Sequence, residues 1–212
     1  MKKVHRFLIP YTPIGTFAIS DSAQIHLLKN VLKFKEGEQC IFFTDGGDDI
    51  LCTLKTIEAK GIIAVAEKTL PKKKVAKEVT ACISITKRDS FELIVQKLTE
   101  LGVKAIVPIL SGRTIKQAIN QERLQKISDE ALEQCGLSER VLLKNPIALE
   151  KALECYKETE QIYFDTAASS TSKRSSRNST FYIGPEGGWS DEDRALFEKY
   201  HAQKALLSNS TL

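Results

Sequence analysis

The stretch FYIGPEGGWSDED, residues 181–193, places three glycines and one proline between an apolar run and the expected start of a helix. Glycine adopts positive φ angles and proline fixes its own φ, so the middle of this stretch predicts a turn. Ser190 and Asp193 have the spacing of a capping box, and acidic residues at 191–193 suit the positive end of a helix dipole. The stretch therefore predicts a strand, a turn and a helix in succession.

The turn does not match a phosphate-binding loop. The segment GPEGGWS is neither GxxxxGK[ST] nor GxGxxG, and Glu186 would place a negative charge beside a phosphate. Since the helix start is capped by its own side chains, the backbone of residues 183–188 is free to bind a neutral or cationic ligand. An adenine edge or a sulfonium would suit it. A plain turn that only joins two elements is the alternative.

Outward from this stretch, strands and helices alternate. Continuously apolar strands separated by helices predict a mainly parallel sheet with helices on both faces. We expect Asp89 or Ser90 to cap the first of these helices and Gly102 to end it. The expected strands are 81–86, 104–110, 161–165, 180–184 and 203–208, and the expected helices are 90–101, 120–135, 148–156 and one from 190.

The first 70 residues have a different pattern of predicted elements. Short runs typical of strands at 5–9, 40–45, 50–57 and 61–70 are separated by turn residues, which predicts a small barrel or a tightly curled sheet. One helix is expected at about 21–32. The segment PKKKVAKE (71–78) then breaks the pattern with a proline and a charge run, so we predict domains at 1–72 and 73–212.

Composition and charge limit the functional classes. No apolar run reaches the roughly 18 residues of a membrane span, and a proline interrupts the N-terminal segment, so we expect a soluble, cytoplasmic protein. Five scattered cysteines without CxxC spacing predict neither a disulfide framework nor a metal site. The net charge of +4 lies in residues 1–74, with 12 Lys and Arg against 8 Asp and Glu, while the remainder has 19 of each. This asymmetry favours an N-terminal part that faces a polyanion, with chance as the alternative.

Six blocks of the sequence together resemble the RsmE family of the SPOUT superfamily. They are HRF (5–7), QKLTELGV (96–103), P-x-x-S-x-R (108–113), EALEQCG (130–136), IGPEGGWSDED (183–193) and LLSNSTL (206–212). The second and fifth blocks at this separation form a highly specific combination. Members of the family methylate N3 of a uridine in bacterial 16S rRNA and use S-adenosylmethionine.

The resemblance implies an α+β two-domain fold, with an N-terminal PUA-like β-barrel that binds RNA and a C-terminal α/β SPOUT domain containing a trefoil knot. It also implies a homodimer that acts on 16S rRNA of the small ribosomal subunit, at uridine 1498. Family members continue past the position of Leu212 with an Arg-x-Glu-Thr-Ala segment, so we expect the C-terminal end to be truncated. An RNA-binding ribosome-assembly protein with weak or lost catalysis is the alternative function.

Candidate site residues follow from the resemblance and from their chemistry. Arginine stays protonated and donates hydrogen bonds in a fork, so Arg6 and Arg113 are expected to stabilise negative charge on the uracil carbonyls, with RNA-phosphate contacts or surface pairs as the alternative. No metal is expected. The expected cofactor-binding residues are Ile183, Gly184, Pro185, Glu186, Gly187, Gly188, Leu207 and Leu212. The expected RNA-binding residues are Lys2, Lys3, Arg6, Lys29 and Lys33.

Overall fold

The computed structural model describes residues 4–71, 78–115, 117–170 and 178–207 of this chain. The chain divides into two compact units, one of residues 1–74 with 129–140 and one of residues 75–128 with 141–212. The first unit thus includes a late segment that the sequence pattern did not assign to it. The predicted boundary between residues 72 and 73 falls at residues outside the described ranges and stays a prediction.

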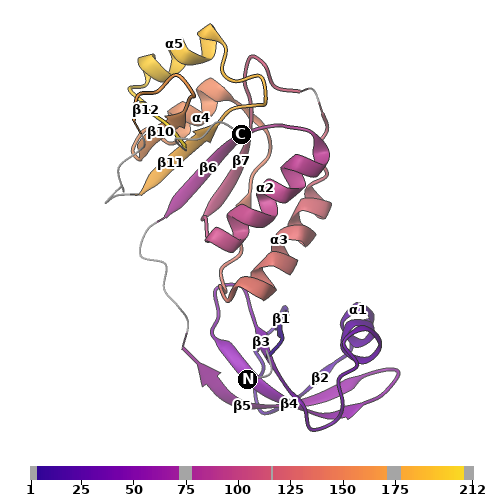
Figure 1. Cartoon of the computed structure of the whole chain (residues 1–212). Helices are drawn as coiled ribbons and strands as arrows, with labels where there is room; N and C mark the ends of the chain where they lie inside the picture. The colour runs from indigo at the N-terminus through magenta and orange to yellow at the C-terminus, as the bar shows by residue number, and fades with distance from the viewer. Residues whose placement is uncertain (1–3, 72–77, 116, 171–177, 208–212) are drawn as a thin grey trace. The chain divides into compact units, whose positions relative to one another are not determined.

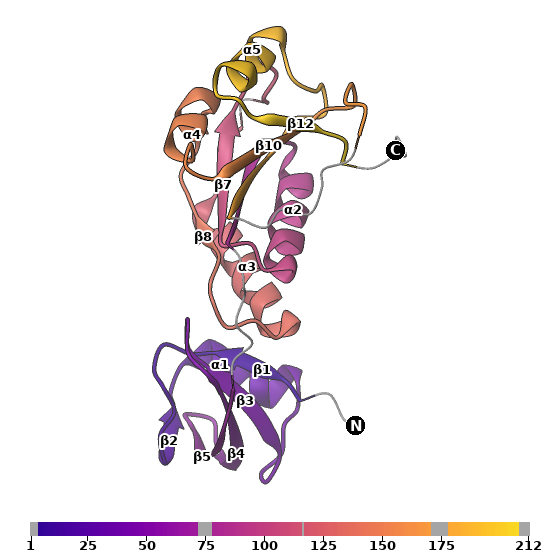
Figure 2. The ribbon, with the colours of Figure 1, turned by 90° about the vertical axis from the view of Figure 1, so that its left-hand side faces the viewer.

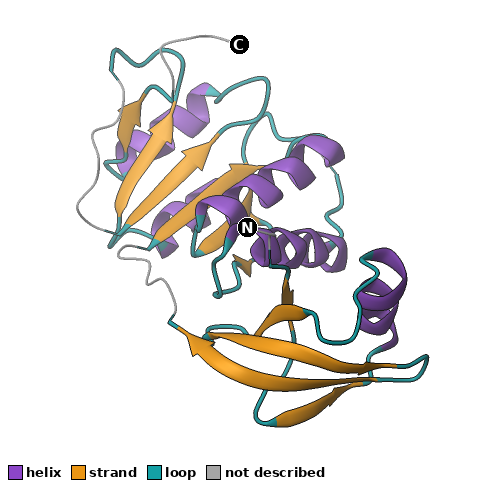
Figure 3. Ribbon diagram, turned by 60° about the horizontal axis from the view of Figure 1, so that its bottom comes forward, coloured by secondary structure: helices purple, strands orange, loops and turns teal. Residues whose placement is uncertain are grey.

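The first unit contains a five-stranded sheet in the order β1-β3-β4-β5-β2. Figure 3 shows strands of both units in orange. Strand β1 runs parallel to β3, and the other pairs are antiparallel. The strands are β1 (Arg6–Leu8), β2 (Thr16–Ile19), β3 (Gln39–Phe43), β4 (Asp49–Ile57) and β5 (Ile62–Leu70). Strand β2 was not among the strands expected from the sequence.

The sheet of the first unit is open, which corrects the expectation of a closed barrel. Within the described residues β1 and β2 form the two edges and do not pair. Main-chain groups of His5 and Ile9 bond to β3, so the amide of Leu8 faces away from the sheet. That amide donates to the Glu133 carboxylate at 2.8 Å. A side chain from helix α3 therefore occupies the place where a closing strand would bond.

The helix expected near residues 21–32 forms in two parts. Helix α1 (Ser22–His26) is capped by Asp21, whose Oδ1 accepts from the Gln24 amide, and a π-helical segment η1 (Leu27–Val31) follows directly. Ile25 and Leu28 on this pair of segments are buried in the core of the first unit with Phe7, Phe42 and Leu54. Lys33, just past η1, has a φ of 55°.

The second unit contains a parallel sheet in the order β12-β10-β11-β6-β7-β8, with β9 also pairing with β7. The prediction of a parallel sheet is confirmed. Strand β11 lies between β10 and β6 in the sheet. It directly follows β10 in the sequence, whereas β6 lies much earlier in the chain. The strands are β6 (Val79–Ser84), β7 (Ala105–Leu110), β8 (Leu142–Leu143), β9 (Ile147–Ala148), β10 (Glu160–Phe164), β11 (Ser179–Ile183) and β12 (Gln203–Ala205).

Helices cover both faces of this sheet, as the sequence predicts (Figures 1 and 2). Side chains of β6 alternate: Cys82 packs in the cluster under α4 and α5, whereas Ala81 and Ile83 pack in the cluster under α2 and α3. The helices are α2 (Arg88–Leu101), α3 (Gln121–Cys135), α4 (Leu149–Cys155) and α5 (Asp191–Lys199). No helix in the described ranges is long and apolar enough to cross a membrane.

The ends of helix α2 match one expectation and contradict another. Gly102 ends the helix with a φ of 78°, as predicted. The helix begins one residue after Lys87, without a side-chain cap, so the expected cap at Asp89 or Ser90 is wrong. Both residues lie inside the first turn instead. The described residues do not test the predicted trefoil knot, which stays a prediction.

Replacing Glu133 by glutamine should make the stability of the first unit less dependent on pH. Burial raises the pKa of Glu133, so the folded protein holds this proton more tightly than the unfolded chain. Its contribution to stability is therefore largest at low pH and is lost as pH rises through the folded pKa. Glu133→Gln keeps an oxygen acceptor for the Leu8 amide and removes the titration.

Urea unfolding followed by circular dichroism between pH 4 and 8 measures how stability changes with pH, with the exposed Glu130→Gln as control. Parallel pH profiles for the wild type and Glu133→Gln would contradict it.

Candidate active site

Five parallel strands of the second unit end at one edge of the sheet, where ligands of open α/β sheets commonly bind. The segments that leave this edge include the loop after β7, the glycine turn after β11 and the residues after β10 and β12. Three of the sequence blocks noted above converge there. They are P-x-x-S-x-R, the glycine turn with its helix start, and the first residues of LLSNSTL.

The loop after β7 connects three elements through three consecutive residues. The Ser111 hydroxyl lies 3.0 Å from the Ser84 hydroxyl at the end of β6. The amide of Gly112 donates to both carboxylate oxygens of Asp193 in α5, at 3.1 and 3.2 Å. Arg113 Nη1 donates to the carbonyl of Gly187 in the glycine turn at 2.7 Å. This loop therefore positions the turn and the helix that follows it.

Gly112 occupies a position where no side chain fits. A Cβ atom built there would lie 2.6 Å from Ser190 Oγ and 3.0 Å from Ser190 Cβ. Real Cβ atoms do not approach other atoms so closely, so only glycine allows this backbone to reach the start of α5. Sequence reasoning treated residue 112 as an unspecified position of P-x-x-S-x-R. The glycine between Ser111 and Arg113 was the feature of the sequence that could have identified this position.

The start of α5 has the predicted capping box. The Asp193 amide donates to the Ser190 hydroxyl at 3.1 Å, and the Ser190 amide donates to Asp193 Oδ2 at 2.9 Å. The Asp193 side chain is buried and also accepts the Gly112 amide. One carboxylate therefore caps the helix and holds the loop after β7, so its buried oxygens are hydrogen-bonded.

The glycine turn is closed by its own backbone and anchored by a tryptophan. The Gly188 amide donates to the Pro185 carbonyl at 2.8 Å, and Gly188 has a φ of 70°. Trp189 is 1% exposed, and its Nε1 donates to the Phe164 carbonyl at the end of β10. A Cβ atom at Gly184 would lie 3.1 Å from this indole ring. Trp189 was not singled out from the sequence, although it is the one tryptophan of the chain.

The expected cofactor-binding residues lie together only in part. Ile183 through Gly188 form the turn, with Pro185 buried and Glu186 and Gly187 exposed. Leu207 follows β12 and is 66% exposed. Leu212 lies outside the described residues. The turn therefore combines exposed residues, Glu186 and Gly187, with the buried Pro185.

An ion pair beside the turn was missed in the sequence. Asp165 follows β10, and its buried carboxylate accepts the Ala167 amide and Arg194 Nε, each at 2.9 Å. Burial alone would raise the pKa of Asp165, but the hydrogen bonds from Ala167 and Arg194 together lower it. The ion pair therefore fixes the end of β10 to helix α5, and Arg194 balances the charge of the carboxylate.

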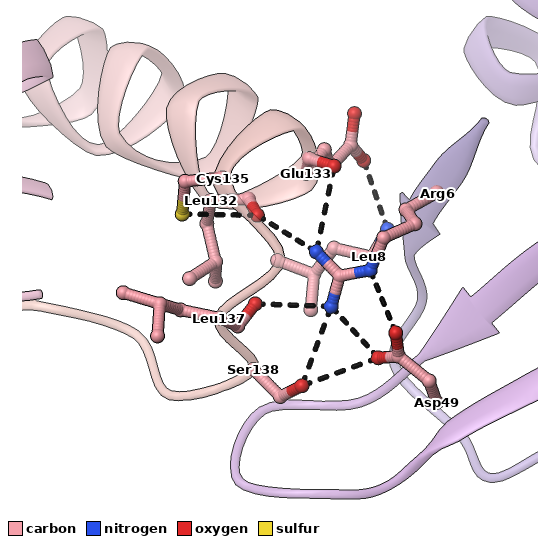
Figure 4. A network of polar contacts seen from close by, with 8 residues as sticks. All are labelled: Arg6, Leu8, Asp49, Leu132, Glu133, Cys135, Leu137 and Ser138. Carbon is pink, nitrogen blue, oxygen red and sulfur yellow. Dashed lines mark hydrogen bonds and ion pairs between the residues drawn. The ribbon is translucent and has the colours of Figure 1, made fainter. Parts of the chain in front are cut away.

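Arg6 is the centre of a polar network in the first unit (Figure 4). Its Nε and Nη2 form a bidentate pair with Asp49 at 2.8 and 2.7 Å. The Nη1 group donates to the carbonyls of Leu132 and Glu133, and Nη2 also donates to the Leu137 carbonyl at 3.0 Å. The guanidinium carbon lies 4.2 Å from the Phe43 ring centre.

All five N–H groups of Arg6 therefore have acceptors, and its side chain is 9% exposed. The network joins β1 and the start of β4 to the end of helix α3. Direct contact of Arg6 with a substrate would require breaking these bonds, so the geometry gives it a positioning role. Of the other expected RNA-binding residues, Lys33 is exposed, Lys29 is half-buried, and Lys2 and Lys3 lie outside the described residues.

Similarity to known proteins covers most of the chain. Residues 72–212 match a family model described as an RNA methyltransferase domain. The chain is 29% identical over 199 residues to the ribosomal RNA small subunit methyltransferase E of Bacillus subtilis, covering 84% of this chain and 77% of that protein. Identity to the protein of the same name from Rickettsia conorii is 22% over 200 residues, covering 92% and 82%.

A solved structure shows the same similarity in three dimensions. It is a ribosomal RNA small subunit methyltransferase E from Neisseria gonorrhoeae, bound to S-adenosyl methionine. The TM-score is 0.89 at 25% sequence identity, and the match covers 99% of this chain and 91% of that one.

Gly112→Ala should destabilise the second unit by roughly 1–3 kcal/mol, because the added methyl overlaps the cap of α5. Trp189 is the one tryptophan and belongs to the second unit, so its fluorescence during urea unfolding reports on that unit. Gly187→Ala is the matched control, since a Cβ there would lie at an ordinary 3.6 Å from the Arg113 side chain. Equal midpoints for the two variants would contradict the steric argument.

Arg6→Ala should destabilise the first unit by roughly 3–5 kcal/mol, because it leaves the partly buried Asp49 carboxylate and several carbonyls without a donor. Far-UV circular dichroism should show an early unfolding step that Trp189 fluorescence does not follow. Arg140→Ala, which removes a more exposed pair with Asp129, should cost about 1 kcal/mol or less. An Arg6→Ala protein as stable as the Arg140→Ala protein would disprove the positioning role.

Proposed function

This chain belongs to the RNA methyltransferase domain family, and from that premise we propose that it methylates N3 of one uridine, uridine 1498, in 16S rRNA of the small ribosomal subunit. The proposed cofactor is S-adenosylmethionine. The observation that carries the proposal is the glycine turn with its exposed backbone. Trp189 anchors the turn to the Phe164 carbonyl, and Arg113 donates to the Gly187 carbonyl. The small-subunit rRNA methyltransferases that the chain resembles support the same reaction.

The residues at the turn suit this cofactor. The exposed backbone at Glu186 and Gly187 can bind the edge of an adenine, and the helix that follows has no free start for a phosphate. The Asp165–Arg194 ion pair joins the end of β10, which anchors Trp189, to helix α5 and so supports the turn. The backbone of this turn would hold the cofactor, which would supply an electrophilic methyl group to N3, and the N3 proton would leave to solvent.

Arg113 can serve both the turn and the substrate. One N–H group of its guanidinium holds the Gly187 carbonyl at 2.7 Å. Its other N–H groups form no hydrogen bond with the residues that the structure describes, and the side chain is exposed. Loss of the N3 proton places negative charge on the two uracil carbonyl oxygens, and a guanidinium is a suitable donor to them. We therefore assign charge stabilisation to Arg113, and positioning to Arg6.

The first unit is the proposed RNA-binding part. Its residues 1–74 carry an excess of four basic residues, whereas its segment 129–140 is acidic. Lys29 and Lys33 lie in and just after the π-helical segment η1. Lys2 and Lys3 are proposed to bind phosphates as well. Binding through several lysines should weaken steeply as salt concentration rises.

The proposed assembly is a homodimer with a knotted second unit. Leu110 ends β7, while Ile115 and Leu207 follow β7 and β12, and the three expose between 38% and 66% of their surface. Large apolar side chains at the edge that binds the cofactor are suited to an interface between two copies. The knot would form where the residues after β12 pass the glycine turn.

The proposed function predicts that unmethylated small ribosomal subunits acquire 3-methyluridine when incubated with this protein and S-adenosylmethionine. Mass mapping of nuclease fragments names the modified base directly. Methylation at another position would retain the enzyme class and overturn the assigned base. If calorimetry detects no S-adenosylmethionine binding, the methyltransferase proposal fails for this chain.

The same titration tests Arg113. Arg113→Ala frees the Gly187 carbonyl, so cofactor affinity should fall about tenfold or more. Lys151→Ala, which removes an exposed pair with Glu154 on α4, is the control. Unchanged affinity in Arg113→Ala would show that the turn keeps its shape without this bond.

A further inference from the structure

A cavity lies in the same unit, away from the glycine turn. It has a volume of about 300 Å³ and lies between the start of α2 and the segment that leads into α3. It shares no lining residue with the turn at 183–188 or with Leu207. Its volume is at the lower end of the roughly 300–1,000 Å³ typical of ligand sites, which suits one small planar group better than a whole cofactor.

The walls of this cavity combine an apolar floor with amide groups. Ile85, Phe91 and Leu124 are almost fully buried and form apolar wall. Gln117 lines the cavity, is half-buried, and forms no hydrogen bond with any other described residue. The Asn120 Oδ1 atom accepts the Arg123 amide, which leaves its NH₂ group without a described partner. Such a site offers flat apolar contact and unused amide donors and acceptors.

Charged residues beside the cavity join its walls. Glu92 lines the cavity and accepts Arg88 Nε at 3.0 Å and Arg123 Nη2 at 2.7 Å, which joins α2 to α3. Hydrogen bonds from Arg123 and then from Arg88 lower the pKa of Glu92 to about 2, so it stays ionised. Arg88 lines the cavity, and Arg123 contacts Glu92 from α3, so two guanidinium groups lie close enough to meet a phosphate backbone.

We propose that this cavity receives one unstacked nucleobase of the RNA substrate. The inference rests on the proposed function and assigns to it a base-binding site. Unpaired bases of RNA are recognised by flat apolar contact and by hydrogen bonds to their edges, and this cavity provides both. Glutamine and asparagine amides can pair with a base edge through two hydrogen bonds. The two arginines beside the cavity then face the sugar-phosphate chain as it enters and leaves.

Two substitutions test the cavity in the full-length protein. Gln117→Ala removes the free amide, and Ala118→Leu adds a larger side chain to the lining. Both should raise KM for unmethylated small ribosomal subunits by roughly fivefold or more, because one bidentate pair with a base is worth that factor at least. Calorimetric affinity for S-adenosylmethionine should stay within about twofold of the wild type. Gln96→Ala is the matched control, since this α2 amide lies outside the cavity and pairs with Glu100.

Two outcomes would overturn the proposal. Folded variants with unchanged KM would show that the cavity does not bind RNA. A parallel loss of S-adenosylmethionine affinity would assign the cavity to the cofactor. If the wild type transfers no methyl group at all, the proposed function fails, and the cavity is tested separately. Single-stranded RNA containing 4-thiouridine is then cross-linked and the modified peptide mapped: attachment within residues 117–124 supports the cavity, and its absence refutes it.

Discussion

The close approach of Gly112 to the start of helix α5 is the constraint on which the candidate active site depends. Because residue 112 has no side chain, its amide reaches the buried Asp193 carboxylate, and the neighbouring residues then reach β6 and the glycine turn. Without this approach Arg113 would lose its bond to the Gly187 carbonyl. The shape of the turn is therefore set by residues about 74 positions away in the chain.

A buried arginine has the comparable role in the first unit. Arg6 extends from a three-residue edge strand and saturates its hydrogen bonds with Asp49 and with carbonyls at the end of α3. The same helix end supplies Glu133 to the edge of β1. An edge that would otherwise accept another strand is covered by a helix, and the sheet stays open. The two sequence blocks HRF and EALEQCG thus meet around one guanidinium.

Local sequence patterns predicted the elements well and their connections less well. Apolar runs located the strands of the second unit, and the capping box at Ser190 was predicted because both partners lie within one helical turn. Strand β2 was missed because its four residues carry a short and weak pattern. The closed barrel was expected because closely spaced strands do not reveal which edges pair. The cap of α2 was misplaced because Lys87 provides no capping side chain to recognise.

The sequence by itself determined the two kinds of unit, the parallel sheet with helices on both faces, and the family to which the six blocks point. These depend on periodicity and on motifs, which are local properties of the chain. Only the tertiary structure decided that Arg6 is enclosed, that Gly112 must lack a side chain, that Trp189 anchors the turn and that Asp165 pairs with Arg194. Each of these depends on contacts between residues far apart in sequence, whose distances no local pattern encodes.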